Sequence, residues 1–221
     1  MIRMDSASVA IVDFGLGNLY SVKRTCEYVG LRASITSDRS EIERADGIIL
    51  PGVGAFGDAM AALKRNDLVG LLRDAAAANR PLMGICLGVQ LLMTQSEEFG
   101  NHEGLDIFKG SVVRFRDPCE GNRNLKIPHV GWSQISPAQQ DWKDSPLQDV
   151  TPGEFMYFVH SFCVQPAEQN AILSLTRYGQ IVFCSSIQRG NLFACQFHPE
   201  RSGVEGLKIY ASWARLLGRK S

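Results

Sequence analysis

The first half of the chain alternates short apolar runs with amphipathic stretches. Apolar runs typical of buried strands lie at residues 9–13, 47–50 and 81–86. Apolar positions spaced as on one face of a helix follow at residues 19–29, 58–66 and 68–79. Strands that alternate with helices at this spacing predict a largely parallel sheet with helices on both faces.

The pattern changes after Glu98, where short alternating segments replace the long helices. We expect a polar surface loop at residues 116–126, a last helix at residues 204–217, and strands at residues 111–115, 154–159, 171–175, 181–187 and 191–197. Several of these strands are candidates for antiparallel hairpins. The sequence thus predicts an α/β fold of three layers on an open mixed sheet, in one domain over residues 1–221.

Cys86 stands between a predicted buried strand and the amphipathic helix that we expect to follow it. Gly84 and Gly88 lie two residues before and after it, as in the G-x-nucleophile-x-G turn that lifts a reactive side chain clear of a sheet. At the first turn of a helix, unpaired N–H groups and the helix dipole favour a thiolate, and the N–H of Leu87 would face a developing oxyanion. The pattern favours a nucleophile, and a small buried core residue is the alternative.

Two loops that contain glycine follow predicted strands. Gly15 and Gly17 lack the third glycine of a dinucleotide-binding fingerprint, because Tyr20 stands in its place. The loop at residues 51–54 has glycines around Val53, which allows a backbone N–H to turn toward a ligand. An ordinary turn is the alternative interpretation of this loop.

Composition narrows the classes of partner. Lys plus Arg and Asp plus Glu number 23 each, which favours neither nucleic acid nor an anionic membrane as a partner. No apolar run approaches the roughly 18 residues of a membrane span, and residues 1–12 lack a long apolar core, so we expect neither a span nor secretion. Six cysteines without a C-x-x-C pair argue against a zinc site or a disulfide framework, and favour a cytoplasmic protein with reduced thiols.

A catalytic thiolate needs a base, and four histidines are candidates. His198 follows a predicted strand at the sheet edge where open α/β sheets place their sites, and we expect Pro199 to keep the chain extended. Residues two apart in an extended segment point the same way, so Glu200 can orient the imidazole. A strand-end histidine beside a solvated glutamate is the alternative. For His160, which closes a predicted strand, we expect a structural hydrogen bond.

Taken together, these motifs resemble those of a known enzyme family. Residues 84–90 (Gly-Ile-Cys-Leu-Gly-Val-Gln) and 196–200 (Gln-Phe-His-Pro-Glu) are similar to the class I, triad-type glutamine amidotransferases. Further motifs resemble the glutaminase subunits of imidazole glycerol phosphate synthases within that family, at residues 51–54, 128–132, 157–161 and 196–202. The resemblance runs in order along nearly the whole chain and implies a flavodoxin-like fold.

The resemblance implies a division of labour. Cys86 would attack the side-chain amide of L-glutamine, while His198 would carry protons to the leaving ammonia and from water. Glu200 would orient His198. The N–H of Leu87 and a turning peptide at Val53 would form the oxyanion hole. No metal or other cofactor is implied.

The resemblance also implies the substrate contacts and the partner. Glutamine would meet Gly54, Gln90, Glu98, Ser161 and Phe162, with Glu98 facing its α-ammonium group. The partner would be a (β/α)8 barrel cyclase subunit, forming a heterodimer. It would use the ammonia to make imidazole glycerol phosphate and the aminoimidazole carboxamide ribonucleotide of histidine biosynthesis. The expected docking face includes residues 15–18 with Asn18, residues 129–132 with Trp132, and Arg201.

Two positions depart from the family pattern and leave other functions open. Phe162 stands where the family usually has tyrosine, and Ser133 where it often has asparagine. A related glutaminase subunit that supplies ammonia to a barrel synthase for the amidination of surface sugars is therefore an alternative. A catalytically inactive scaffold or regulatory module and a cysteine peptidase are weaker alternatives, because the candidate triad and the glycine loop at residues 51–54 are both present.

Overall fold

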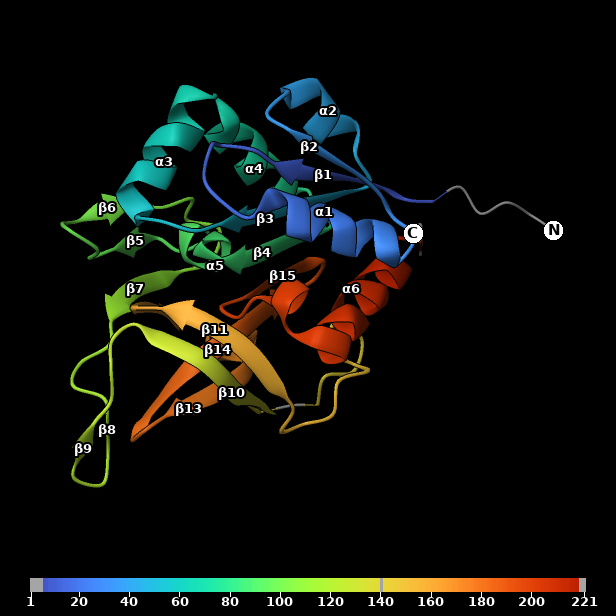
Figure 1. The fold of residues 1–221 in the computed structure, drawn as a ribbon. Coiled ribbons are helices and arrows are strands. Elements are labelled where there is room, and N and C mark those ends of the chain that lie inside the picture. Colours follow the sequence, from blue (N-terminus) through green and yellow to red (C-terminus); the bar gives the residue numbers. More distant parts are fainter. Residues whose placement is uncertain (1–5, 140, 219–221) are drawn as a thin grey trace.

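The computed structural model describes residues 6–139 and 141–218. Four parallel strands form one end of its large sheet, in the order β2-β1-β3-β4: β1 (Ser8–Val12), β2 (Arg32–Thr36), β3 (Gly47–Gly52) and β4 (Leu82–Cys86) (Figure 1). β3 and β4 are buried along their whole length, as expected of apolar strands inside a parallel sheet. Their carboxyl ends lie at the same edge, because the register pairs Gly52 with Cys86.

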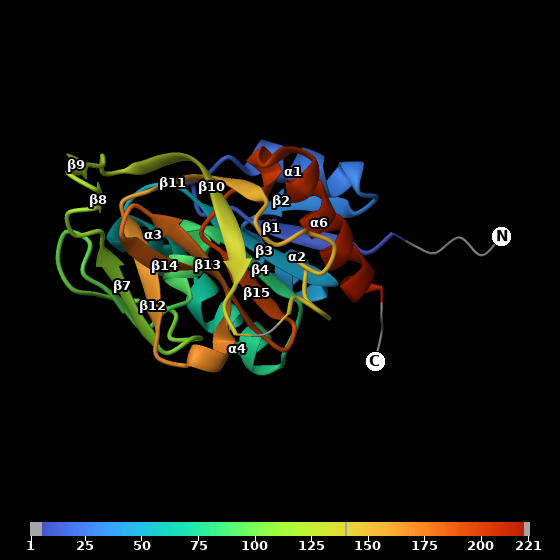
Figure 2. The same cartoon turned by 90° about the horizontal axis from the view of Figure 1, so that it is seen from below.

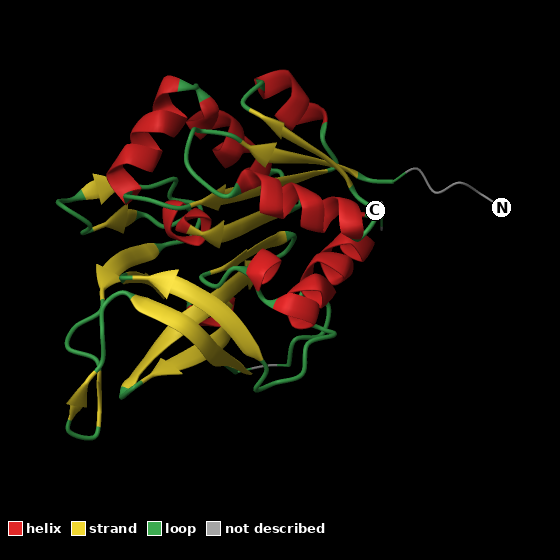
Figure 3. Ribbon diagram, in the orientation of Figure 1, coloured by secondary structure: helices red, strands yellow, loops and turns green. Residues whose placement is uncertain are grey.

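Helices cover both faces of these strands (Figures 1 and 3). Successive strand residues point to opposite faces, so Ala10 and Val12 enter one core while Val9 and Ile11 enter the other. The first core is closed by α2 (Arg39–Arg44), α3 (Phe56–Arg65) and α4 (Leu68–Ala77), and the second by α1 (Leu19–Tyr28) and α6 (Gly203–Leu217). This is the three-layer arrangement that the sequence predicts.

The second half of the chain extends the sheet, mostly with antiparallel strands. β15 (Leu192–Cys195) runs parallel to β4. The order then continues through β14 (Ile181–Arg189), β12 (Phe162–Pro166), β7 (Gly110–Arg114), β5 (Gln95–Ser96) and β6 (His102–Glu103). A side branch of β13 (Ile172–Tyr178), β10 (His129–Pro137) and β11 (Phe155–His160) forms a lobe below the parallel strands (Figures 1 and 2).

Several elements differ from the sequence-based expectation. The apolar pattern predicts neither β2 nor α2, and it predicts no strand at β10 or β12. The apolar pattern does not predict β2 because three of the five residues of this edge strand are polar, and most of the strand is only half-buried. The expected surface loop at residues 116–126 contains a short hairpin, β8 (Cys119–Glu120) and β9 (Arg123–Asn124). The expected strand at residues 171–175 is preceded by a 3-10 turn, η1 (Gln169–Ala171), and extends to Tyr178.

A membrane-spanning helix is absent from residues 6–139 and 141–218, where no helix combines the required length with the required hydrophobicity.

Candidate active site

Cys86 ends β4 in a backbone conformation that side chains rarely adopt. Its φ is +54° and its ψ −106°, and strain of this kind concentrates at functional sites. A larger residue at either flanking glycine would clash with its surroundings. A Cβ at Gly88 would lie 1.8 Å from the carbonyl oxygen of Leu50, and a Cβ at Gly84 would lie 2.9 Å from the Cβ of Ala194. The chain therefore makes the sharp strand-to-helix turn that the sequence predicts around Cys86.

The helix behind the thiol, α5 (Leu87–Leu91), has five residues, all of them buried. The expectation of an amphipathic helix after Cys86 is therefore wrong. A helix this short is held because residues 104–108, which we call the cap segment, satisfy its last carbonyl groups. Backbone N–H groups of the cap segment donate to the carbonyl oxygens of Leu91 and Leu92 at 2.8 to 3.0 Å.

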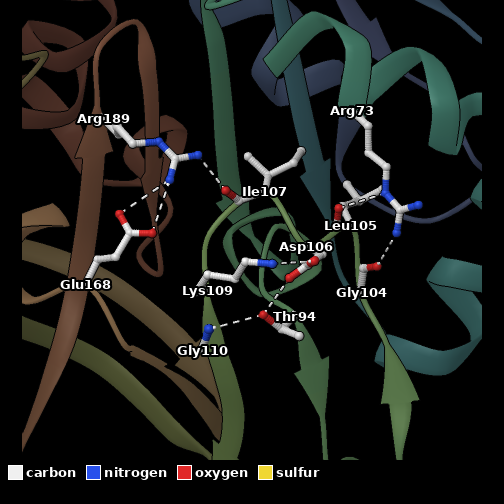
Figure 4. A network of polar contacts seen from close by, with 10 residues as sticks. All are labelled: Arg73, Thr94, Gly104, Leu105, Asp106, Ile107, Lys109, Gly110, Glu168 and Arg189. Atoms are coloured by element: carbon white, nitrogen blue, oxygen red, sulfur yellow. Dashed lines mark hydrogen bonds and ion pairs between the residues drawn. The ribbon is translucent and has the colours of Figure 1, made fainter. Parts of the chain in front are cut away.

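Two arginines hold the cap segment from outside (Figure 4). Arg73 of α4 donates to two of its carbonyl oxygens, at 2.9 and 3.2 Å. Arg189 of β14 donates to the carbonyl oxygen of Ile107 and pairs with Glu168 at 3.4 Å. The carboxyl-terminal end of α5, the helix that follows the thiol, is thus tied through the cap segment to α4 and β14.

His198 and Glu200 are buried against each other just beyond the end of β15. Nδ1 of His198 lies 2.8 Å from Oε1 of Glu200, and the two side chains are 5% and 2% exposed. Burial alone would lower the pKa of His198, but interactions with Cys86 and Glu200 raise this pKa to about 10. His198 is therefore an imidazolium at neutral pH, placed between a sulfur and a carboxylate that both favour its charge.

The chain reaches this pairing by a route that the sequence pattern does not predict. Pro199 does not keep the segment extended, because Pro199–Arg201 form a 3-10 turn, η2, that brings the carboxylate of Glu200 back to the ring. The hydroxyl of Ser202 donates to the carbonyl oxygen of His198 at 2.7 Å and closes the turn. Within the described residues Nε2 of His198 has no hydrogen-bond partner, so it is the ring nitrogen available to the thiol and to a substrate.

A chain of amide groups connects the thiol to the pocket wall. Nε2 of Gln90 donates to the carbonyl oxygen of Phe162 and to Oε1 of Gln196, each at 3.1 Å. A backbone carbonyl only accepts, so the atom of Gln90 that faces it must be the nitrogen. Gln196 then directs its own nitrogen to the sulfur of Cys86, at 3.7 Å. Because both hydrogens of Gln90 Nε2 are used in this way, Oε1 is the atom with which Gln90 can receive a donor from a ligand.

Gln196 is a functional candidate that the sequence reasoning does not assign. Its side chain is fully buried, and its nitrogen is directed at the candidate nucleophile. The available signal is local: Leu192–Phe197 is apolar except for this one amide. A buried polar side chain in an apolar strand needs a partner, and here the partners are Gln90 and Cys86.

The thiol opens into a pocket of about 280 Å³. The pocket brings together all the residues expected in the oxyanion hole and at the substrate: Val53, Gly54, Leu87, Gln90, Glu98, Ser161 and Phe162. Pro128, Val159 and His160 complete the lining.

The two sides of this pocket differ in how their residues are held. Oε2 of Glu98 accepts a hydrogen bond from the backbone N–H of Phe56 at 2.7 Å, at the start of α3. Leu87 is buried at the start of α5. Val53, by contrast, is 41% exposed and precedes Gly54, whose φ of +117° favours glycine. The side of the pocket at Val53 is therefore the one with room to turn.

Three residues expected at a partner interface, Asn18, Trp132 and Arg201, are exposed. Trp132 packs edge-on against the ring of Tyr157, and the guanidinium of Arg201 lies 5.5 Å from the centre of that ring. Asn18 precedes α1, which packs beside η2. The expectation that His129 also faces a partner is wrong, because the His129 side chain is only 2% exposed. His129 lies three residues from Trp132 on β10, so the two side chains point to opposite faces of the strand.

The fold and the site together define an α/β protein with a candidate cysteine nucleophile at a strand-to-helix turn. The sequence profile described as "Glutamine amidotransferase class-I" matches residues 10–213. The chain belongs to the class I glutamine amidotransferase family, which confirms the resemblance seen in its motifs.

Curated relatives narrow the comparison. The chain is 44% identical to imidazole glycerol phosphate synthase subunit HisH of Rhodopirellula baltica, over 93% of this chain and 96% of the relative. It is 43% identical to the protein of the same name from Moorella thermoacetica, over 95% of each chain. Among solved structures, a glutamine amidotransferase crystal structure matches with a TM-score of 0.71 at 16% identity, over 95% of this chain and 98% of the other, and supports the fold.

Proposed function

We propose that this chain is the glutaminase subunit of an imidazole glycerol phosphate synthase in the cytoplasm, and that it passes ammonia from L-glutamine to a (β/α)8 barrel cyclase subunit. The observation that carries the activity is Cys86 at a strained turn, interacting with His198 of the His198–Glu200 pair and open to the pocket. The relatives named above carry the name of this synthase subunit, so the amidination of surface sugars is not favoured.

The proposed reaction proceeds through a thioester. The sulfur of Cys86 attacks the amide carbon of glutamine, and the N–H groups of Leu87 and Val53 receive the negative charge that develops on the oxygen. His198 gives its Nε2 proton to the leaving nitrogen, which departs as ammonia. The neutral ring then takes a proton from a water that attacks the thioester, releasing glutamate and restoring the thiolate. Glu200 keeps the ring oriented and stabilises its charge in the first and last stages.

The pocket supplies matching groups for glutamine. Oε1 of Gln90 is an acceptor for the donors of the substrate, and the carboxylate of Glu98 suits its α-ammonium group. Gly54, Ser161 and Phe162 line the same pocket and complete the proposed contacts.

The exposed Val53 suggests how a partner controls the rate. Docking of the barrel with its nucleotide substrate bound, on the face that carries Asn18, Trp132 and Arg201, would turn the Val53 peptide and complete the oxyanion hole. One oxyanion-hole donor is worth about 10²-fold or more in kcat, so the isolated subunit should be slower by about that factor.

The proposal is tested with the barrel subunit encoded in the same genome. Glutamate release from glutamine is measured for the chain alone, with the barrel, and with the barrel and its nucleotide substrate. The expected result is an increase of about 10²-fold in the last case. Growth of a histidine auxotroph that lacks its own glutaminase subunit, with the barrel coexpressed, tests the pathway, with Cys86→Ala as the inactive control. Equal glutaminase rates in all three mixtures would remove the gating, and failure to restore growth would contradict the pathway.

A further inference from the structure

Two histidines outside the candidate triad meet behind the pocket wall. The antiparallel register of β10 and β11 places His129 opposite His160. Nδ1 of His129 lies 3.2 Å from Nε2 of His160, and both side chains are buried. Burial lowers the pKa of His129 to about 4 and that of His160 to about 3, so both rings are neutral at pH 7.

The direction of every hydrogen bond in this pair follows from one fixed acceptor. Nδ1 of His160 lies 2.8 Å from the carbonyl oxygen of Phe162, which only accepts, so the neutral His160 carries its proton on Nδ1. Nε2 of His160 is then an acceptor, and His129 must donate to it from Nδ1. Nε2 of His129 in turn accepts from the hydroxyl of Ser133, at 2.9 Å.

The chain of bonds from Ser133 to Phe162 joins two different parts of the molecule. At its inner end, the carbonyl oxygen of Phe162 also accepts from Gln90, which lines the pocket and continues to Gln196 and Cys86. At its outer end, Ser133 belongs to β10, where the adjacent Trp132 is exposed.

Ring packing leaves this pair little freedom. The ring of His129 stacks on Tyr178 with centroids 4.2 Å apart, and on Phe158 with centroids 5.1 Å apart. The ring of His160 packs against Phe115 and Phe183. Rotation of either ring is therefore restricted by the aromatic rings packed against it.

We propose that Ser133, His129 and His160 are positioning residues that transmit the placement of β10 to the carbonyl group of Phe162, which holds Gln90 at the glutamine site. The inference rests on the proposed function, because it takes glutamine as the ligand of the pocket and a partner subunit as the body that presses on the outer face of β10. Partner docking then tightens glutamine binding through this chain of bonds.

The mildest test removes only the outer hydroxyl group. Ser133→Ala is compared with Ser136→Ala, which deletes the hydroxyl of an exposed residue on the same strand. Both variants are assayed for glutamine hydrolysis as the complex with the purified barrel subunit. Loss of one hydrogen bond should raise the KM of Ser133→Ala for glutamine about fivefold, with kcat within about twofold of wild type. Ser136→Ala should match wild type.

A second pair of variants tests the inner end. His160→Leu removes the donor to Phe162, whereas the side-chain amide of His160→Asn can restore a donor near the position of Nδ1. We expect KM to rise about tenfold or more in His160→Leu and to be partly restored in His160→Asn. Thermal unfolding of each complex shows whether the variants fold, and Ser133→Ala stands as the test if His160→Leu does not.

The outcomes separate this proposal from the proposed function. Unchanged KM values in Ser133→Ala and in the folded His160 variants, or losses confined to kcat or thermal stability, would overturn the positioning role. A wild-type complex that does not hydrolyse glutamine would contradict the proposed function instead. In that case, calorimetric binding of glutamine to Cys86→Ala with and without Ser133→Ala decides the positioning role, with an expected loss of affinity of about fivefold.

Discussion

Two groups of buried histidines lie close to the candidate active site, His198 by itself and His129 with His160, and the two groups differ in charge state. His198 is protonated at neutral pH because Cys86 and Glu200 stabilise its charge against the cost of burial. His129 and His160 are neutral because their main partners are a hydroxyl, a carbonyl and each other. Burial is common to both groups, so the anionic partner decides the charge.

The difference indicates what each group can do. A charged ring next to a thiol can give a proton to a leaving group and take one from water. In the neutral pair, both ring protons are used in hydrogen bonds, so neither ring gives up a proton at neutral pH. The role proposed for this pair is to position the groups bonded to it. The substitutions and measurements below either remove the charged His198 system or the neutral His129–His160 pair, or measure their contributions to activity and stability.

The largest effect should come from removing the charged side of the comparison. Cys86→Ala and His198→Asn should each lower kcat for glutamine hydrolysis by about 10⁴-fold or more, because the thiolate and its proton carrier act as a unit. The double variant should be little worse than either single one. Steady-state assays of the complex measure this, and a residual rate above a tenth of wild type would exclude the triad.

A smaller loss is expected when only the carboxylate partner changes. Glu200→Gln should lower kcat on the order of 10³-fold and lower the pKa of His198, because the ring loses a charged acceptor while the shape is kept. Glu205→Gln, which changes a carboxylate paired with Lys208 on α6, is the control. If both variants retained the wild-type pH profile of kcat, Glu200 would have no role in orienting His198.

Stability should depend on pH in opposite directions for the two groups. The pKa values of His129 and His160 are below the ordinary 6.5, so their contribution is present above pH 6.5 and is lost as pH falls toward 4 and 3. The pKa of His198 is raised, so its contribution is present below pH 6.5 and is lost as pH rises toward 10. Urea unfolding across this pH range measures the loss of stability on the acid side, the acid arm, and on the alkaline side, the alkaline arm.

Two variants separate these arms. His129→Asn should make the acid arm shallower, by on the order of 2 kcal/mol, because only His160 of the two buried neutral rings is then left to take up a proton on unfolding. Cys86→Ala should flatten the alkaline arm. Profiles that run parallel to wild type in both variants would mean that these histidines do not set the pH dependence.

The smallest effect should come from the arginines that hold the cap segment, which lie outside both groups. Arg73→Ala should lower the free energy of unfolding by about 1 kcal/mol, because it removes two hydrogen bonds to backbone carbonyls. Arg177→Ala, at an exposed arginine of β13, is the matched control and should change stability by less than about 0.5 kcal/mol. Equal losses in the two variants would show that the cap segment does not depend on Arg73.

The sequence predicts the charged side of the comparison far better than the neutral side. The strand-to-helix turn around Cys86 is indicated by two glycines within five consecutive residues. The pairing of His198 with Glu200 is indicated within three consecutive residues. Such features need no knowledge of the fold. Even for this pair, the sequence does not predict the backbone conformation, because residues 199–201 form the 3-10 turn η2 where an extended segment is expected.

The neutral side depends on contacts between distant parts of the chain. His129 and His160 are 31 positions apart and meet only because β10 pairs with β11, a strand pairing that the apolar pattern does not predict. Gln196 finds Gln90 across 106 positions, and five-residue α5 is possible only because the cap segment closes it. Local patterns carry no signal for partners that the sheet register brings together.

Nitrogen NMR of the imidazole rings, in protein labelled with ¹⁵N-histidine at pH 7, reports directly which ring nitrogens carry protons. The chain has four histidines, so single substitutions assign each signal. We expect His198 to carry protons on both ring nitrogens, and His129 and His160 to carry one each, on Nδ1. A neutral His198, or a doubly protonated His129 or His160, would contradict the separation of a proton-carrying histidine from a positioning pair.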